Sequence, residues 1–204
     1  MFERSKLWFG AAGVAVALVA SSAFAQQPQG VRLRGMIEKL EGNLLTVKSR
    51  EGADLKVTLA DNATVVGVVK ASLADIKDGA FVGSAAVPQA DGSQKALEVH
   101  IFPEAMRGTG EGHRPYSIPN STMTNGTVGA AVTNVSGSSI TLKYKDGEKQ
   151  IVVSPDTPIV RYVIGDKSDL KAGAAFTILN AVKKSDDMFE TGRINVGRDG
   201  AVPQ

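Results

Sequence analysis

The two histidines of the chain and the glutamates near them are the side chains best suited to hold a transition metal. Imidazole and carboxylate groups are ligands for zinc, nickel, copper and manganese. His100 and Glu98 share one face if this stretch is a strand, because strand side chains repeat every two residues. Glu104, Glu111 and His113 follow in a glycine-rich stretch that could fold back toward them. The spacing of the histidines matches no fixed ligand pattern, so a half-buried His100 and a solvated His113 remain the alternative.

The same stretch holds a second candidate, an anion site made of glycines between two arginines. Gly108, Gly110 and Gly112 free the backbone amides to form a concave nest, and Arg107 and Arg114 flank it. This is not a nucleotide-binding fingerprint, because a histidine stands where that motif has its third glycine and a proline follows where a helix should begin. The segment therefore predicts, at most, a cradle for a small anionic ligand.

A structural role competes with both candidates over the first part of this stretch. Pro103 suits the first position of a helical turn, and Glu104 suits its positive end. Arg107 lies three residues after Glu104 and can pair with it. Phe102 and Met106 would then hold the turn against the preceding domain.

Catalytic motifs are missing from the sequence. There is no Gly-x-Ser-x-Gly elbow and no His-Glu-x-x-His, and there is no cysteine to act as a nucleophile, as a thiolate ligand or in a disulfide. The paired acids Asp186 and Asp187 are expected in a solvated turn between strands. The sequence thus favours a protein that is not an enzyme and that needs no cofactor, with a transition metal as the open exception.

The elements that would position these side chains are short β-strands. Val31, Leu33 and Ile37 alternate with polar residues, and similar alternation recurs at 45–48 and 55–59. Turns containing glycine separate these strands, as is typical of antiparallel sheets. Ser72 and Asp75 can form a capping box on a short plug helix, which two further strands follow.

The second half of the chain repeats this pattern at a nearly constant offset. Segment 135–143 matches 40–48, segment 166–173 matches 72–79, and segment 190–196 matches 95–101. Three strands, a plug helix and two strands is the order of a five-stranded oligonucleotide/oligosaccharide-binding (OB-like) barrel. We therefore predict an all-β fold of two tandem OB-like barrels, each with one short plug helix; a single continuous sandwich is the alternative.

The N-terminal sequence predicts a secretory signal peptide. Basic residues precede an uncharged run over 7–20, which is short for a membrane span of about 20 residues. Ala23 and Ala25 form the small-x-small cleavage pattern. The expected organisation is a signal peptide over 1–25, a mobile leader over 26–34, a first OB-like β-domain over 35–102, a Gly/Pro-rich joint over 103–125, a second OB-like β-domain over 126–197 and a C-terminal tail over 198–204.

Composition narrows the partners. The formal net charge is +2, so no broad field attracts nucleic acid or an acidic membrane. Aromatic residues make up 5% of the chain, few for a surface that stacks bases or sugars. We expect no nucleic-acid partner and no transmembrane span after cleavage of the signal peptide. A protein or small ligand of the cell envelope is the expected partner, and unpaired strand edges leave an oligomer open.

The chain resembles a family of exported bacterial proteins of unknown function with OB-like repeats, some of which carry the label "metal ABC transporter permease". Segments 98–113 and 121–125 carry this resemblance, and the Leu-x-x-Ile-Lys-x-Gly element at 73–79 agrees with it. The resemblance covers most of the chain after the signal peptide and implies a periplasmic protein. It implies no activity, and the permease label has no support in this sequence.

Three functions remain after this reading. The first is a non-catalytic periplasmic binding or adaptor protein of unknown ligand. The second is a periplasmic metal-binding accessory protein that uses the two histidines around the joint. The third is an enzyme with a site in the cleft between the domains.

Overall fold

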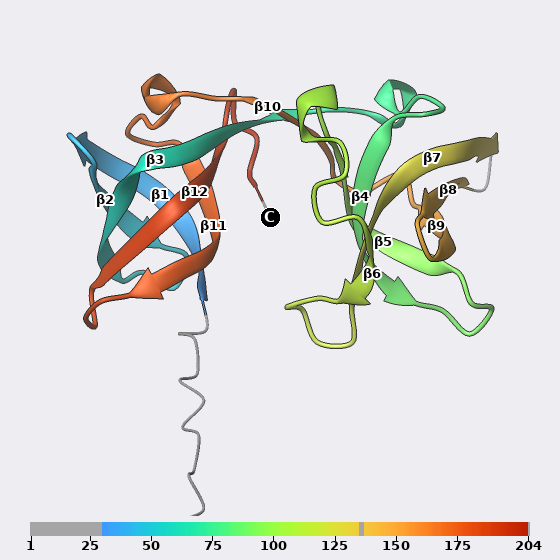
Figure 1. The fold of residues 1–204 in the computed structure, drawn as a ribbon, viewed down its shortest axis with the longest axis horizontal. Helices are drawn as coiled ribbons and strands as arrows, with labels where there is room; N and C mark the ends of the chain where they lie inside the picture. The colour runs from blue at the N-terminus through green and yellow to red at the C-terminus, as the bar shows by residue number, and fades with distance from the viewer. Residues whose placement is uncertain (1–29, 135–136, 204) are drawn as a thin grey trace, which may run out of the picture.

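The computed structural model describes residues 30–134 and 137–203, and within them the protein is all-β (Figure 1). The expected signal peptide and residues 26–29 of the expected leader lie outside the described residues. The strands are β1 (Val31–Glu41), β2 (Leu44–Ser49), β3 (Asp54–Lys70), β4 (Phe81–Pro88), β5 (Gln94–Ile101), β6 (Gly112–Pro115), β7 (Thr122–Asn134), β8 (Gly137–Tyr144), β9 (Gly147–Val153), β10 (Ile159–Ile164), β11 (Ala175–Lys183) and β12 (Met188–Gly197). Three 3-10 turns complete the set: η1 (Leu73–Asp75), η2 (Glu104–Met106) and η3 (Lys167–Asp169).

The strands pair into two rings, which we call the composite lobe and the central lobe (Figure 1). The composite lobe is a closed five-stranded barrel in the order β12-β11-β1-β2-β3, and the β12–β3 pairing closes it. The central lobe has the order β5-β4-β7-β8-β9, with a short β5–β9 pairing between its ends and β6 added beside β7. Strand β10 joins the lobes by pairing with both β3 and β5.

This pairing divides each sequence repeat between the two lobes. The first three strands of the first repeat pair with the last two of the second, and the last two strands of the first repeat pair with the first three of the second. The fold therefore differs from two contiguous barrels over 35–102 and 126–197. The physical reason lies in β3, a 17-residue strand whose first part pairs with β2 and whose last part pairs with β10, so the chain leaves the composite lobe before β4 begins. The β3–β12 ladder has only an irregularity at residues 60–63, so β3 continues without a turn.

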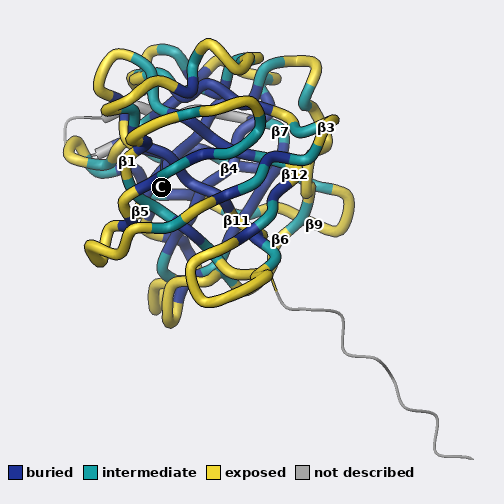
Figure 2. Tube along the Cα trace, turned by 90° about the vertical axis from the view of Figure 1, so that its left-hand side faces the viewer, coloured by how far each residue is buried: buried dark blue, intermediate teal, exposed yellow. Residues whose placement is uncertain are grey.

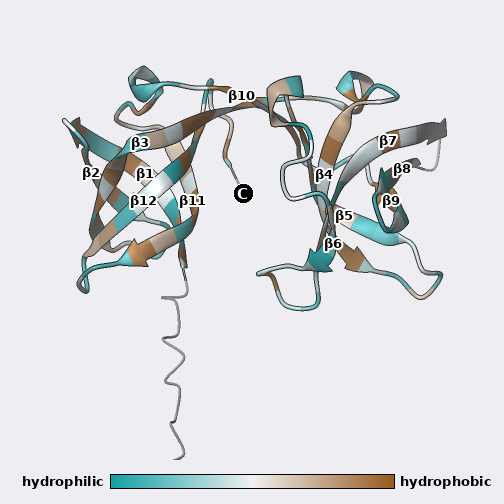
Figure 3. Ribbon diagram, in the orientation of Figure 1, coloured by the Kyte–Doolittle hydropathy of each residue, from teal (hydrophilic) through white to brown (hydrophobic). Residues whose placement is uncertain are grey.

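Alternation of side chains fills the interior of each lobe, as the buried stretches of the trace in Figure 2 show. In the composite lobe the inward positions include Leu45, Val47 and Val57, none of which is exposed. In the central lobe they include Val82 and Leu142. The apolar stretches recur along the strands of both lobes in Figure 3, as the period-two pattern predicts.

A third cluster of buried residues lies between the lobes, where β3 and β10 pair. It joins Val66 and Val68 of β3 to Val160 and Tyr162 of β10, and adds Phe81, Phe102 and Ala201. Met106 of η2 packs against the same cluster, so the helical turn expected after Phe102 is present and packs at this junction.

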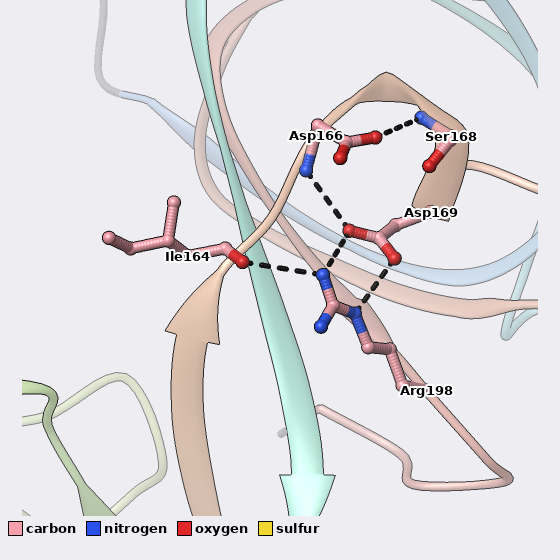
Figure 4. A network of polar contacts seen from close by, with 5 residues as sticks. All are labelled: Ile164, Asp166, Ser168, Asp169 and Arg198. Carbon is pink, nitrogen blue, oxygen red and sulfur yellow. Dashed lines mark hydrogen bonds and ion pairs between the residues drawn. The ribbon is translucent and has the colours of Figure 1, made fainter.

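The expected plug helices are single 3-10 turns that close the lobes. Ser72 Oγ and its backbone N–H both donate to Asp75 Oδ2 at 2.8 Å, as the capping-box motif predicts. Ile76, directly after η1, is buried in the core of the central lobe. In the second turn the backbone N–H of Asp166 donates to Asp169 Oδ2 at 3.0 Å, and Leu170 enters the core of the composite lobe (Figure 4).

The segments outside the expected domains are integral to the sheet. Strand β1 begins at Val31, inside the segment expected to be a mobile leader. The expected joint contains η2, all of β6 and the start of β7. In the expected tail, Ala201 and Pro203 are buried, and the carbonyl of Pro203 accepts a hydrogen bond from Thr177 Oγ1. None of the helical turns among the described residues is long and apolar enough to cross a membrane.

Candidate functional site

A cavity of about 420 Å³ lies between the two lobes and takes side chains from both. The composite lobe contributes outer-face residues of β1, β11 and β12. The central lobe contributes residues of β4, β5, β6 and β7 and of the loop before β6, while Tyr162 of β10 lies at the junction. Its size is that of pockets that hold small molecules.

Alternation explains why the composite wall of the cavity is basic. Leu33 of β1 points into the barrel core, so Arg32 and Arg34 point outward into the cavity. On β12, Ile194 fills the core and Arg193 lines the cavity. The wall thus presents three guanidinium groups from two strands.

The central wall is hollowed by small residues on its middle strand. The β5–β4–β7 register aligns His100 with Gly83 and Gly83 with Asn125. A methyl group added at Gly83 would lie 2.0 Å from His100 Nε2 and 2.5 Å from Asn125 Oδ1. Only glycine lets both side chains lean over β4.

A second row runs parallel to this one. Glu98 is aligned with Ala85, Ala85 with Met123, and Met123 with Arg114 of β6. All four residues line the cavity. A small residue again lies at the centre of the row, and the polar groups stand on either side of it.

Unpartnered polar atoms converge on this cavity. Among the described residues, three buried side-chain atoms lack a hydrogen-bond partner: Arg32 Nε, Glu98 Oε2 and Asn125 Oδ1. All three residues line the cavity. Buried polar groups are nearly always hydrogen-bonded, because an unmade bond costs roughly 1–3 kcal/mol. One donor and two acceptors are therefore available to a ligand in the cavity.

Glu98 is 5% exposed, and burial raises the pKa of its carboxyl to about 7, against a smaller opposing effect of Arg32. His100 is 6% exposed, and burial lowers its pKa to about 3, with Arg114 and Arg193 acting in the same direction. Glu98 Oε1 and His100 Nδ1 lie 3.9 Å apart. Because the imidazole is neutral near pH 7, this contact is not a charged ion pair there.

Aromatic rings fix the orientation of His100. Its ring stacks on Tyr162 with centroids 5.0 Å apart and meets the edge of Phe102 at the same distance. Burial raises the pKa of the Tyr162 phenol, so this ring also stays neutral. The junction side of the cavity is thus an uncharged, largely aromatic surface.

The expected anion nest divides into two parts. Gly110 and Arg114 line the cavity. Arg107 instead pairs with Glu104, as the sequence predicts, and donates to the carbonyl of Gly79 at 3.0 Å. Gly108 and Gly112 have positive φ angles of 81° and 124° and shape the loop without lining the cavity.

The nest's own backbone uses some of its amides. The N–H of Thr109 donates to the carbonyl of Met106, and that of Glu111 donates to the carbonyl of Gly108. These amides are engaged within the loop. Gly110 of the loop lines the cavity, and its carbonyl accepts a hydrogen bond from Nη1 of Arg114 on β6 at 2.6 Å.

The four expected metal ligands are placed apart. His100 lies in the cavity wall, whereas Glu104 pairs with Arg107 and Glu111 accepts from the backbone N–H of Lys145. His113 is hydrogen-bonded to Thr124 Oγ1 at 2.8 Å. No three His, Cys, Asp or Glu residues gather to hold a metal ion anywhere in 30–134 or 137–203.

Several cavity residues were not singled out from the sequence as site residues: Arg32, Arg34, Asn125 and Arg193. For the three arginines, the signal was their place at the outward positions of strands whose inward positions are apolar. That signal indicates a functional face only once the two lobes are known to face one another. Glu98 was considered on its shared face with His100, which the cavity confirms.

Comparisons with known proteins add no relative: no family model matches the chain, and neither curated proteins nor solved structures give a significant match.

Proposed function

We propose that this chain is a non-catalytic binding protein whose site is the cavity between the lobes and whose ligand is a small organic anion. The observation that carries the proposal is the convergence of all three unpartnered buried polar atoms of the described residues on one cavity. A ligand that completes these bonds removes an unfavourable contribution that the empty protein bears.

The charge of the lining favours an anion. Four arginines line the cavity: Arg32, Arg34, Arg114 and Arg193. Glu98 is the single carboxylate among the lining residues, and the buried His100 is neutral near pH 7. Arginine binds carboxylate and phosphate groups through paired, charge-assisted hydrogen bonds.

The shape of the cavity favours a ligand with an apolar portion. Phe102, Tyr162 and Tyr116 line it together with Leu97 and Met123. Pockets for small molecules combine such apolar walls with a few polar groups that fix orientation. An inorganic ion alone would leave these walls without contact.

The setting of this function is part of the same proposal. We propose that the lobes are OB-like barrels, that the chain is exported through its signal peptide, and that it works in the periplasm as the resembled family implies. The closed five-stranded ring supports the first point. The N-terminal sequence pattern supports the second.

Calorimetric titration of residues 26–204 with glutarate and with inorganic phosphate tests the proposal. Glutarate should bind, and the double variant Arg34→Gln, Arg193→Gln should weaken it by roughly tenfold or more, because hydrogen bonds to charged groups are lost. Arg50→Gln, at an exposed turn outside the cavity, is the matched control and should leave binding unchanged. Absence of binding, or equal weakening by the control, would contradict the proposal.

A further inference from the structure

The two walls of the cavity occupy equivalent positions in the sequence repeats and differ in their polar side chains. Segment 190–196 is the counterpart of 95–101, so Arg193 stands where the other repeat has Glu98. The row Asn195–Thr177–Arg34 on the composite wall is the counterpart of His100–Gly83–Asn125 on the central wall. The composite wall thus presents three arginines, whereas the central wall presents Glu98 and Asn125 together with Arg114.

Two buried acceptor atoms on the central wall have no hydrogen-bond partner in the protein. Glu98 and Asn125 are 5% and 4% exposed, and each leaves one side-chain oxygen without a partner. The amide nitrogen of Asn125 donates to the carbonyl of Thr109 at 2.9 Å, which directs its oxygen away from the loop. Arg32 lies close enough to influence Glu98, yet no ion pair within 4.0 Å joins these two described residues.

We propose that the ligand is an acidic amino acid, whose ammonium group binds Glu98 on the central wall and whose carboxylates bind the arginines that face it. This inference rests on the proposed function and names the class of anion. An ammonium group supplies the N–H donors that the open acceptors require and can form a charged pair with the Glu98 carboxylate. The two carboxylates can pair with guanidinium groups of the lining, of which those of Arg34 and Arg193 lie on the composite wall.

A hydroxyl group at the same place would make a hydrogen bond but would not form a charged pair with the buried carboxylate. The nearby rings do not supply a countercharge, because His100 is buried and neutral near pH 7 and Tyr162 is an uncharged phenol. The ligand therefore carries its own positive charge into the cavity.

Calorimetric titrations at pH 7.5 with L-glutamate, D-glutamate and glutarate separate the two levels of the proposal. Glutarate has the same two carboxylates as glutamate without the amine. At least one enantiomer of glutamate should bind the wild type tenfold or more tightly than glutarate does. Glu98→Gln should abolish this preference, whereas Arg193→Gln should weaken both compounds alike.

Folding of the variants is checked by circular dichroism and thermal melting. Arg50→Gln again serves as the control outside the cavity, and Asn125→Asp, which adds a negative charge beside the same site, should increase the preference for glutamate. Binding of glutarate as tight as that of glutamate, or a preference that survives Glu98→Gln, would overturn the amino-acid inference and leave anion binding standing. If none of the three compounds binds, both proposals fail.

Discussion

The composite and central lobes are built alike and differ in what they present to each other. In each lobe three strands from one repeat pair with two from the other, and a capped 3-10 turn closes one end. Their facing rows nevertheless contrast, since the composite wall carries Arg34 where the central wall carries Asn125, across from Thr177 and Gly83 respectively. Duplicate strands can therefore build one asymmetric site, because the outward positions are free to diverge while the inward positions keep the core.

The largest expected effect concerns Glu98, which has an arginine as its counterpart. Between pH 4.5 and about 7 the buried carboxyl keeps a proton that the unfolded chain has lost, so its contribution to stability falls as the pH rises through this window. The wild type should lose about 3 kcal/mol relative to Glu98→Gln across it. Urea unfolding at several pH values measures this difference.

His100 acts in the opposite direction. Its pKa of about 3 lies below the usual 6.5, so its contribution to stability rises with pH between these values. The comparison with Glu98→Gln is therefore more informative than the wild-type profile alone. Glu38→Gln, on the exposed face of β1, is the matched control; it keeps Glu98, so its stability should follow that of the wild type across the same window. A constant difference between the wild type and Glu98→Gln would show that the carboxyl is not protonated in the folded protein near neutral pH.

The next effect in size tests the hollow of the central wall. Gly83→Ala would place a methyl group against His100 and Asn125, so we expect the free energy of unfolding to fall by roughly 1–3 kcal/mol. Glutamate binding should weaken as well, because both side chains of the central wall would be displaced.

Gly192→Ala is the control for that substitution. Gly192 also lines the cavity, yet nothing lies within 4 Å of where its Cβ would be. Thermal melting should separate the two variants clearly. Equal melting temperatures would mean that His100 and Asn125 can move aside without cost. This outcome would contradict a rigid placement of the two side chains in the central wall.

The strands and turns could be predicted from local sequence patterns, but the path of the chain between the lobes could not. The strands, the turn at Gly42 and the capping box at Ser72 depend on neighbouring residues, which the sequence displays directly. Which repeat each strand joins depends on β3 running straight through residues 60–63, where no proline or glycine forces a turn and either pairing would satisfy the same alternation.

The candidate site was partly found for the same reason. Gly110, Arg114 and His100 were singled out by residue type within one short stretch, and all three line the cavity. Arg34 and Arg193 belong to strands far apart in the sequence, and only the exchange of strands brings them opposite Glu98. A site assembled by non-local pairing leaves no compact motif in the sequence.

The smallest effect concerns the two capped turns, which differ in how an arginine reaches them. Arg198 of the tail donates from Nε and Nη2 to both oxygens of Asp169, at 2.7 and 2.6 Å (Figure 4). Arg161 of β10 donates to one oxygen of Asp75 at 2.7 Å. In the repeat alignment Gly67 is the counterpart of Arg161, and a Cβ there would lie 2.9 Å from Arg198 Nε. Arg198 of the tail thus supplies a guanidinium group where the first repeat has Gly67 instead of an arginine.

Arg198→Gln should therefore lower the free energy of unfolding by roughly 1–2 kcal/mol, since a bidentate pair on a mostly buried carboxylate is lost. Arg161→Gln should cost less, because both partners of that pair are about two-fifths exposed, with side-chain exposures of 42% and 39%. Urea unfolding of the two variants beside Arg50→Gln measures the order. A larger loss for Arg161→Gln would contradict this order. It would show that β10, which pairs with both lobes, depends more on its arginine than the tail does.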